Sequence, residues 1–271
     1  MITVYWAVNS LTKPEGIRAD PPINIRDKIT REKIKPYMLR IPESAKSVKI
    51  LSHKVDAENI ERELEYNKCP AWVNEINNLY GIKSYVDFKI KAEDNGKVQH
   101  SYDEIFMERY FRCRHWPSRL FSVSQDYTFF TDSNSLLMSQ LPAYYEDNDI
   151  ANKTMPVAGV YDIGKYQRFL EFAFHLKKGI REIEFSRNDI MFYVKFHTTE
   201  QINFKRFFWT PEMQSVLIPM MRAKDHKRSD AKSTVLSFYY NIFNKYNFKE
   251  TLLKEIEKNL CKDEDESGKV K

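Results

Sequence analysis

Two histidines and one glutamate in the middle of the chain have the residue types of a metal site. They are His175, Glu182 and His197, in a region where apolar and polar residues alternate. A non-haem iron centre needs two histidines and one carboxylate with open coordination positions. If the turn at Lys178–Gly179 is tight, Glu182 lies across from His175, and Tyr193 lies near them on the next strand. These side chains could then hold a metal ion or a polar ligand.

The direction of this polar side decides whether such a site can form. His175, Glu182, Tyr193, Lys195 and His197 all belong to the polar side of the alternating strands. Inside a jelly roll, that side could enclose a metal ion. In a half-solvated antiparallel sheet it faces water instead, while the phenylalanine side faces the core. The second arrangement is favoured because half-solvated antiparallel sheets are common.

Three tyrosines are the candidate ligand-binding residues, namely Tyr144, Tyr145 and Tyr193. The first two follow a segment, residues 129–143, that combines a strand end, a polar turn and a short apolar run. Polar side chains in such a turn can bond to nearby backbone groups. Loops held on a rigid scaffold often carry function, yet no residue pattern here indicates a reaction. We therefore expect the paired tyrosines to form a contact surface and not a catalytic loop.

Signature motifs of common enzyme classes are missing from the chain. There is no P-loop, dinucleotide fingerprint, HExxH zinc motif, deaminase signature or GxSxG elbow. The HxD spacing common in barrel oxygenases does not occur, and 7 glycines leave little room for a phosphate-cradling loop. The sequence therefore identifies no catalytic residue and no cofactor.

The charge pattern argues against a nucleic-acid partner. Lys and Arg total 43 against 38 Asp and Glu, giving a net charge of +5. Nucleic-acid proteins concentrate such charge on one face, whereas here both signs are spread along the chain. One segment, ERYFRCR at 108–114, interleaves arginines with aromatics, but a strand with its aromatics inward and its arginines outward is the favoured explanation. The favoured partner is a protein, either a second copy or another chain.

Cysteine usage and hydropathy indicate the compartment. The three cysteines, Cys69, Cys113 and Cys261, form neither a disulfide framework nor a CxxC metal pattern. This usage fits a reducing compartment. The first residues lack the features of a signal peptide, and no run reaches the roughly 20 apolar residues of a membrane helix. We expect a soluble protein of the cytoplasm, or of a host's cytoplasm if a phage encodes it.

The pattern of apolar residues predicts a mainly β fold. Period-two alternation predicts a strand at 2–8 and a meander of neighbouring antiparallel strands over 157–208. Further strands are predicted at 47–52, 86–91, 105–111, 119–124 and 127–131. Helices are predicted at 56–66 and at 71–80 with Gly81 as the cap, with one helical turn at 30–36.

The end of the chain changes to helical periodicity. Residues 211–222 are apolar with a spacing that differs from the period of two in the strands. Residues 229–261 show two amphipathic stripes with a break near Asn247. The expected fold is an antiparallel β-sandwich or jelly-roll-like domain over 1–222, with a helical insertion near 56–80. A C-terminal helical pair over 223–262 packs on it, followed by a disordered tail at 263–271.

Five segments resemble an uncharacterised protein family of bacteria and of tailed phages of marine bacteria. They are CPAW with Asn74 (69–74), NLYG (78–81), GVYDIGKY (159–166) and RNDIMFYVKFHT (187–198), together with the 129–145 stretch. The resemblance covers most of residues 69–208 and implies a phage or marine-microbe source. The family has no established activity, so no catalytic residue follows from it.

Two functions remain open from the sequence. The first is a non-enzymatic binding or assembly protein, of phage origin, that uses loops at the sandwich edge and the C-terminal helix face. The missing enzyme signatures favour it. The second is a metal-dependent enzyme, oxygenase-like or cupin-like, with its site at His175, Glu182 and His197.

Overall fold

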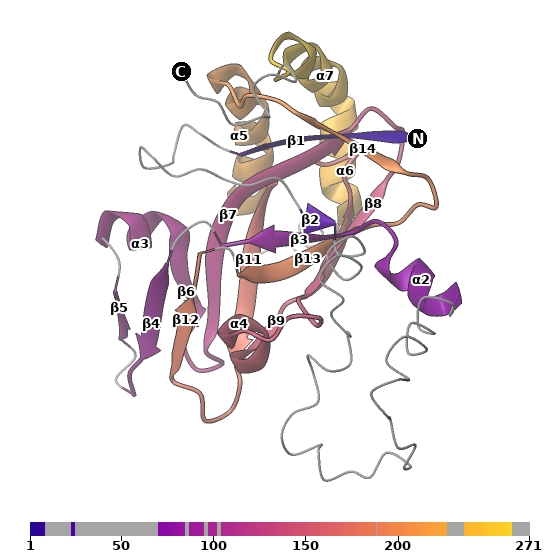
Figure 1. The fold of residues 1–271 in the computed structure, drawn as a ribbon. Coiled ribbons are helices and arrows are strands. Elements are labelled where there is room, and N and C mark those ends of the chain that lie inside the picture. The colour runs from indigo at the N-terminus through magenta and orange to yellow at the C-terminus, as the bar shows by residue number, and fades with distance from the viewer. Residues whose placement is uncertain are drawn as a thin grey trace, which may run out of the picture.

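The structure is a computed structural model of the chain, and it is mainly β with helices at its periphery (Figure 1). It describes residues 1–8, 23–24, 70–84, 87–94, 97–101, 104–187, 189–226 and 236–261. Three sheets account for the strands in these ranges, and nearly all their pairings are antiparallel. None of the helices in the described ranges is both long and apolar enough to cross a membrane.

The largest sheet among the described residues, sheet A, has six strands. Its order is β14 (Ile202–Arg206), β1 (Ile2–Val8), β7 (Leu120–Thr131), β11 (Phe169–Leu176) and β9 (Thr154–Pro156), with β6 (Phe111–His115) also paired to β7. The β1–β14 pair is parallel, while β7 pairs antiparallel with β1, β6 and β11.

The other two sheets are antiparallel throughout. Sheet B has the order β10 (Gly159–Asp162), β8 (Leu137–Pro142), β13 (Ile190–Phe196), β3 (Leu79–Lys83) and β2 (Ile23–Asn24). Sheet C, at the side of the molecule in Figure 1, has the order β12 (Glu182–Phe185), β4 (Phe88–Ala92) and β5 (Val98–His100).

Aromatic side chains join the inner faces of sheets A and B into one core. Phe172 of β11 stacks on Phe192 of β13 with ring centroids 5.5 Å apart. Phe129 of β7 meets Phe196 of β13 edge to face at 5.7 Å. All four rings are at most 1% exposed, so the two sheets form an open sandwich around them.

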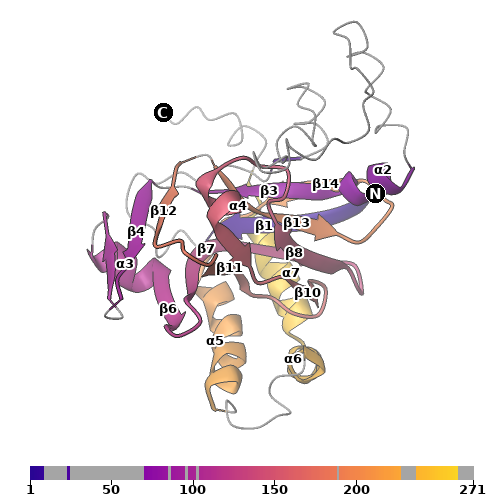
Figure 2. The ribbon, with the colours of Figure 1, turned by 90° about the horizontal axis from the view of Figure 1, so that it is seen from below.

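The C-terminal helices cover the opposite face of sheet A (Figure 2). Successive side chains on a strand point to opposite faces. Phe129 therefore enters the sandwich, while its neighbour Phe130 packs against Phe243 of α6 at 6.0 Å. The helices are α5 (Pro211–His226), α6 (Leu236–Lys245) and α7 (Phe248–Lys258). Asn247 separates α6 from α7 in a left-handed conformation, with φ of 49°. The expected sandwich and C-terminal helical pair are confirmed.

The predicted meander over 157–208 is wrong in its pairing. Its strands β11, β12 and β13 do exist, but they belong to sheets A, C and B respectively. Alternation shows only that a segment has one apolar face, whereas the strand's partner is decided by which apolar faces can meet. Here Phe172 and Phe192 meet across the sandwich instead of side by side in one sheet.

Two local predictions are also wrong. Residues 105–111 were expected as a strand, but Glu104–Tyr110 form helix α3. The helix expected at 71–80 is α2 (Pro70–Ile76), and Gly81 lies in β3 instead of capping it. A Cβ at Gly81 would lie 2.7 Å from Ile190 Cδ1, so glycine lets the Ile190 side chain of β13 pack directly over β3.

Some of the other predicted elements merge into one in the structure, and several lie outside the described residues. The strands expected at 119–124 and 127–131 form the single long strand β7, whose pairing with β11 shifts register near its middle. The strand at 86–91 matches β4, which pairs with β5. The helical turn at 30–36, the strand at 47–52, the helix at 56–66 and the tail at 263–271 lie outside the described residues.

Candidate functional site

Strand β13 is buried along its whole length, including the side predicted to be polar. Each of its seven residues is buried, with Tyr193 at 0% and Lys195 at 9% exposure. One face of β13 lies against sheet A. Helix α2 and the turn after β8 contribute contacts to the other face, because Glu75 and Tyr144 both reach it. The favoured expectation that this side faces water is therefore wrong for β13.

The three candidate ligand-binding tyrosines lie together on this outer face of sheet B. Ring centroids are 4.6 Å apart for Tyr144 and Tyr145, 5.3 Å for Tyr144 and Tyr193, and 6.0 Å for Tyr145 and Tyr193. The Tyr193 hydroxyl donates to Glu146 Oε1 and accepts from the Tyr145 N–H. These bonds hold the turn after β8 against the sheet, so the rings form a rigid cluster.

An ion pair closes the cluster from the side of α2. Lys195 Nζ lies 2.7 Å from Glu75 Oε2, and Tyr144 donates its hydroxyl proton to Glu75 Oε1 at 2.7 Å. Lys195 also donates to the backbone carbonyls of Asn74 and Glu75. Desolvation alone would raise the pKa of the Glu75 carboxyl, but the bonds from Lys195 and Tyr144 lower it below its ordinary value. The carboxylate is thus charged and fully engaged at neutral pH.

A serine and a histidine pair on the same face. Ser139 Oγ lies 2.6 Å from His197 Nε2, and Ser139 faces Lys195 across the β8–β13 pair. Desolvation and the positive charge of Lys195 lower the pKa of the His197 imidazole. A neutral imidazole beside a serine hydroxyl is a possible general base. The Lys195 ammonium, however, already has three protein acceptors, so it is not available to stabilise a developing oxyanion.

A cavity of about 390 Å³ adjoins Tyr144 at the edge of the cluster. Its lining comes from the turn after β8, from α4 (Asp149–Lys153), from β9, from the end of β11 and from β13. The lining residues are Pro142, Ala143, Tyr144, Ala151, Thr154, Met155, Pro156, Lys177 and Met191. This volume lies within the range of small-molecule sites.

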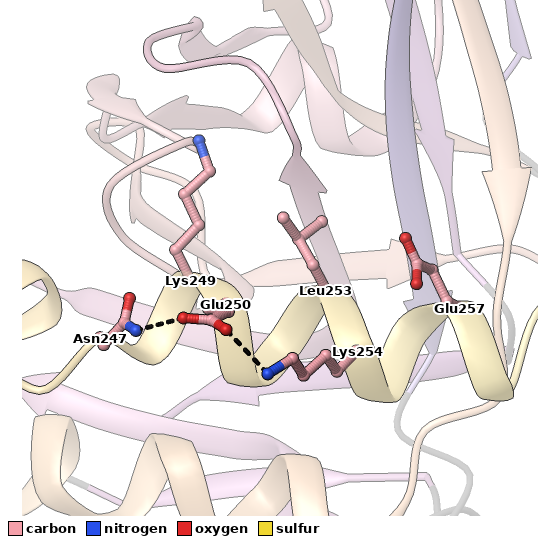
Figure 3. A pocket seen from close by; sticks show the side chains of 6 residues that line it. All are labelled: Asn247, Lys249, Glu250, Leu253, Lys254 and Glu257. Carbon is pink, nitrogen blue, oxygen red and sulfur yellow. Dashed lines mark hydrogen bonds and ion pairs between the residues drawn. The ribbon is translucent and has the colours of Figure 1, made fainter.

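A second cavity, of about 440 Å³, lies along α7 (Figure 3). Three of its four charged lining residues have partners: Glu250 accepts from Asn247 and pairs with Lys254. Lys249 donates to the Ser133 carbonyl at 2.7 Å. Because these groups are paired within the protein, the α7 cavity offers less for ligand recognition than the one beside Tyr144.

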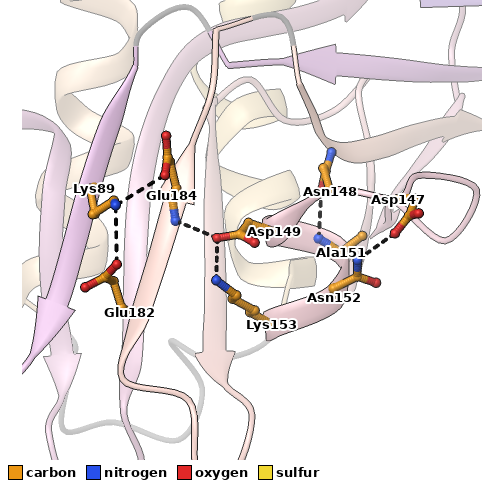
Figure 4. A network of polar contacts seen from close by, with 9 residues as sticks. All are labelled: Lys89, Asp147, Asn148, Asp149, Ala151, Asn152, Lys153, Glu182 and Glu184. Atoms are coloured by element: carbon orange, nitrogen blue, oxygen red, sulfur yellow. Dashed lines mark hydrogen bonds and ion pairs between the residues drawn. The ribbon is translucent and has the colours of Figure 1, made fainter. Parts of the chain in front are cut away.

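The predicted metal residues lie on or directly after strands of three different sheets. His175 is on β11, where its Nδ1 lies 2.8 Å from the Ser118 carbonyl oxygen. Glu182 is on β12 and pairs with Lys89 (Figure 4). His197 follows β13. The structure does not bring the three together, and no group of three His, Cys, Asp or Glu residues within the described ranges could hold a metal ion.

The sequence pointed to the three tyrosines and to Lys195, but not to the contacts that hold them together. Glu75 and Lys195 are separated by 120 residues, so no local pattern links them. Glu146 was visible only as part of an acidic loop after Tyr145. No residue pattern in the sequence indicates Lys177 or the cavity that it lines. The elements around that cavity, α4, β9 and β13, come together only in the fold.

No family model matches the chain, and neither does any curated protein or any solved structure.

Proposed function

We propose that the protein is a non-enzymatic assembly protein, of phage origin, that pairs with a second copy of itself through strand β10. The single observation that carries this proposal is the exposed, apolar segment 155–160, whose strand β10 has no neighbouring strand on the side away from β8 among the described residues. The resemblance of most of residues 69–208 to a family of bacteria and tailed marine phages supports the phage origin.

The edge is apolar and exposed at consecutive positions. Residues 155–160 read Met-Pro-Val-Ala-Gly-Val, without a polar side chain. Met155, Val157 and Val160 are 53%, 45% and 49% exposed, and Leu137 on the adjacent β8 is 46% exposed. Exposed hydrophobic residues scattered singly are ordinary, but a contiguous group marks an interaction surface.

The backbone of this edge has hydrogen-bonding groups without partners. Strands β9 and β10 are the last strands of sheets A and B. The Ile163 N–H bonds to Leu136 O, whereas the Asp162 N–H points away from β8 and reaches the Tyr240 hydroxyl. Successive N–H groups of a strand point alternately to its two sides. The Val160 N–H, two residues before Asp162, therefore also points away from β8. No acceptor for it is found among the described residues, so β10 can accept another strand.

A second copy fits this edge better than an unrelated strand. Two β10 strands paired antiparallel around a twofold axis would use the same N–H and C=O of Val160 reciprocally. Residues 155–160 carry no charge, so the segment does not repel its own copy.

Light scattering after size-exclusion chromatography tests the proposal. The wild-type protein should form a dimer whose population rises with concentration, and Val160→Lys should shift it to monomer, because the charge would be buried at the pair. Ile218→Lys, which changes an exposed branched residue on α5, should leave the mass unchanged. A wild-type protein that stays monomeric at all concentrations would contradict the proposal.

Metal analysis of the purified protein tests the enzyme alternative. Stoichiometric iron, zinc or manganese that is lost in His175→Ala and His197→Ala would overturn the non-enzymatic function.

A further inference from the structure

The cavity beside Tyr144 has an apolar floor. Met191 is 0% exposed, and Ala143 and Thr154 are each 2% exposed. Pro142 and Pro156 complete the apolar wall between β8 and β9. A hydrocarbon chain of a few carbons could therefore be removed from water here.

The polar side chains that line the cavity are mostly occupied. The Tyr144 hydroxyl donates to Glu75 Oε1, and the Thr154 hydroxyl donates to the Ile150 carbonyl at 2.6 Å. Neither is then free to donate to a ligand. The lining residues include no carboxylate, and Lys177 is the single charged residue among them.

Lys177 has hydrogen-bonding capacity left. Its Nζ donates to Asn152 O at 2.7 Å and to Ala151 O at 3.2 Å, at the end of α4. An ammonium group has three N–H donors, so one remains. The two carbonyls fix the position of the ammonium at the cavity. Helix α4 is itself held by the Asn148 cap and by the bonds of Asp149 to Lys153 and to the Glu184 N–H (Figure 4).

We propose that this cavity binds a small aliphatic carboxylate. The hydrocarbon chain lies against Met191 and Ala143, and the carboxylate accepts the remaining N–H of Lys177. A charge-assisted hydrogen bond of this kind is stronger than one between neutral groups, so Lys177 selects the carboxylate over a neutral head group. The cavity shares Met155 and Pro156 with the 155–160 edge, so binding is also measured in a variant that does not self-assemble.

Calorimetric titration with hexanoate, and with hexan-1-ol as the neutral comparison, tests this inference. Hexanoate should bind saturably with a dissociation constant of about 1 mM or below, as expected for a ligand of this size. Hexan-1-ol should bind about tenfold more weakly, because it lacks the charge-assisted bond. The titration is repeated on Val160→Lys. Hexanoate binding by this variant shows whether the cavity works without the dimer.

Three variants separate charge recognition from changes in folding. Lys177→Met should weaken hexanoate binding about tenfold and leave hexan-1-ol unchanged. Lys178→Met, at the exposed neighbouring position, should change neither. Ala151→Leu fills the cavity and should abolish binding of both hexanoate and hexan-1-ol. This variant still tests the cavity if Lys177→Met does not fold. No saturable binding of hexanoate, or equal hexanoate affinity in wild type and Lys177→Met, would overturn the proposal.

Discussion

Lys195 Nζ and Glu75 Oε2 lie 2.7 Å apart and join β13 to α2 across 120 residues of sequence. The lysine side chain is 11% exposed and the glutamate side chain 46%. The lysine therefore depends on its partner more than the glutamate does, because a buried ammonium without a counter-charge is costly. This ion pair holds α2 beside the tyrosine cluster on the outer face of sheet B.

Removing the glutamate charge should destabilise the protein. Glu75→Gln leaves the Lys195 ammonium without a counter-charge, and we expect the free energy of unfolding to fall by about 1 kcal/mol. Urea denaturation of Glu75→Gln, Lys195→Met and the double variant measures the coupling between the two residues. Glu250→Gln, at the exposed ion pair on α7, should have no measurable effect. Strictly additive single effects would show that the pair contributes nothing.

Stability should fall on mild acidification because of His197. Its pKa is lowered from the ordinary value of 6.5 by desolvation and by the charge of Lys195. The unfolded chain then binds a proton more readily than the folded chain. The stabilising contribution is complete above pH 6.5 and is lost as the pH falls through the lowered pKa of the folded state.

Urea midpoints between about pH 7.5 and 5.5 measure this effect. We expect His197→Gln to flatten the pH dependence over that window relative to wild type. The lowered pKa of Glu75 acts separately, since its contribution is lost only below the ordinary glutamate value of 4.5. An unchanged slope in His197→Gln would rule out this histidine as the cause.

Asp162 should be essential for the turn that follows β10. It is 2% exposed, accepts N–H bonds from Leu136 and Gly164, and pairs with Lys165. Asp162→Asn would remove the negative charge and replace one accepting carboxylate oxygen with an NH₂ group, which cannot accept a hydrogen bond. We expect a loss of about 2 kcal/mol in the free energy of unfolding. Asp132→Asn, at an exposed position, is the matched control, and equal losses in both variants would contradict the prediction.

Two glycines of the same segment should respond differently to alanine. A Cβ at Gly164 would lie 2.6 Å from the Ser133 carbonyl oxygen, which is backbone and cannot move aside easily. At Gly159 nothing lies within 4 Å. Thermal unfolding should show Gly164→Ala destabilised by about 1–3 kcal/mol, and Gly159→Ala changed by less than about 0.5 kcal/mol. Equal melting temperatures would contradict the close approach at Gly164.

The sequence allowed the candidate site to be predicted in part. Tyr144 and Tyr145 follow a proline-terminated strand, which local patterns reveal, and Tyr193 lies in a clearly alternating segment. Their convergence depends on β8 pairing with β13, which joins residues about 50 positions apart. His175 and Glu182 show the converse: they are close in sequence, but the chain turns at Gly179, with φ of 83°, from sheet A into sheet C.

Local chemistry in the sequence determined the fold class, most strand positions and the break between the C-terminal helices at Asn247. Those features depend on side-chain periodicity and turn preferences, which act over a few residues. Only the tertiary structure decided which strands became neighbours, that the outer face of β13 is buried, and that Lys177 meets Met191 and Tyr144 around one cavity. The reason is that an apolar face does not specify its partner. Phe172 could have packed beside any aromatic strand, and the lowest free energy placed it against Phe192 across the sandwich.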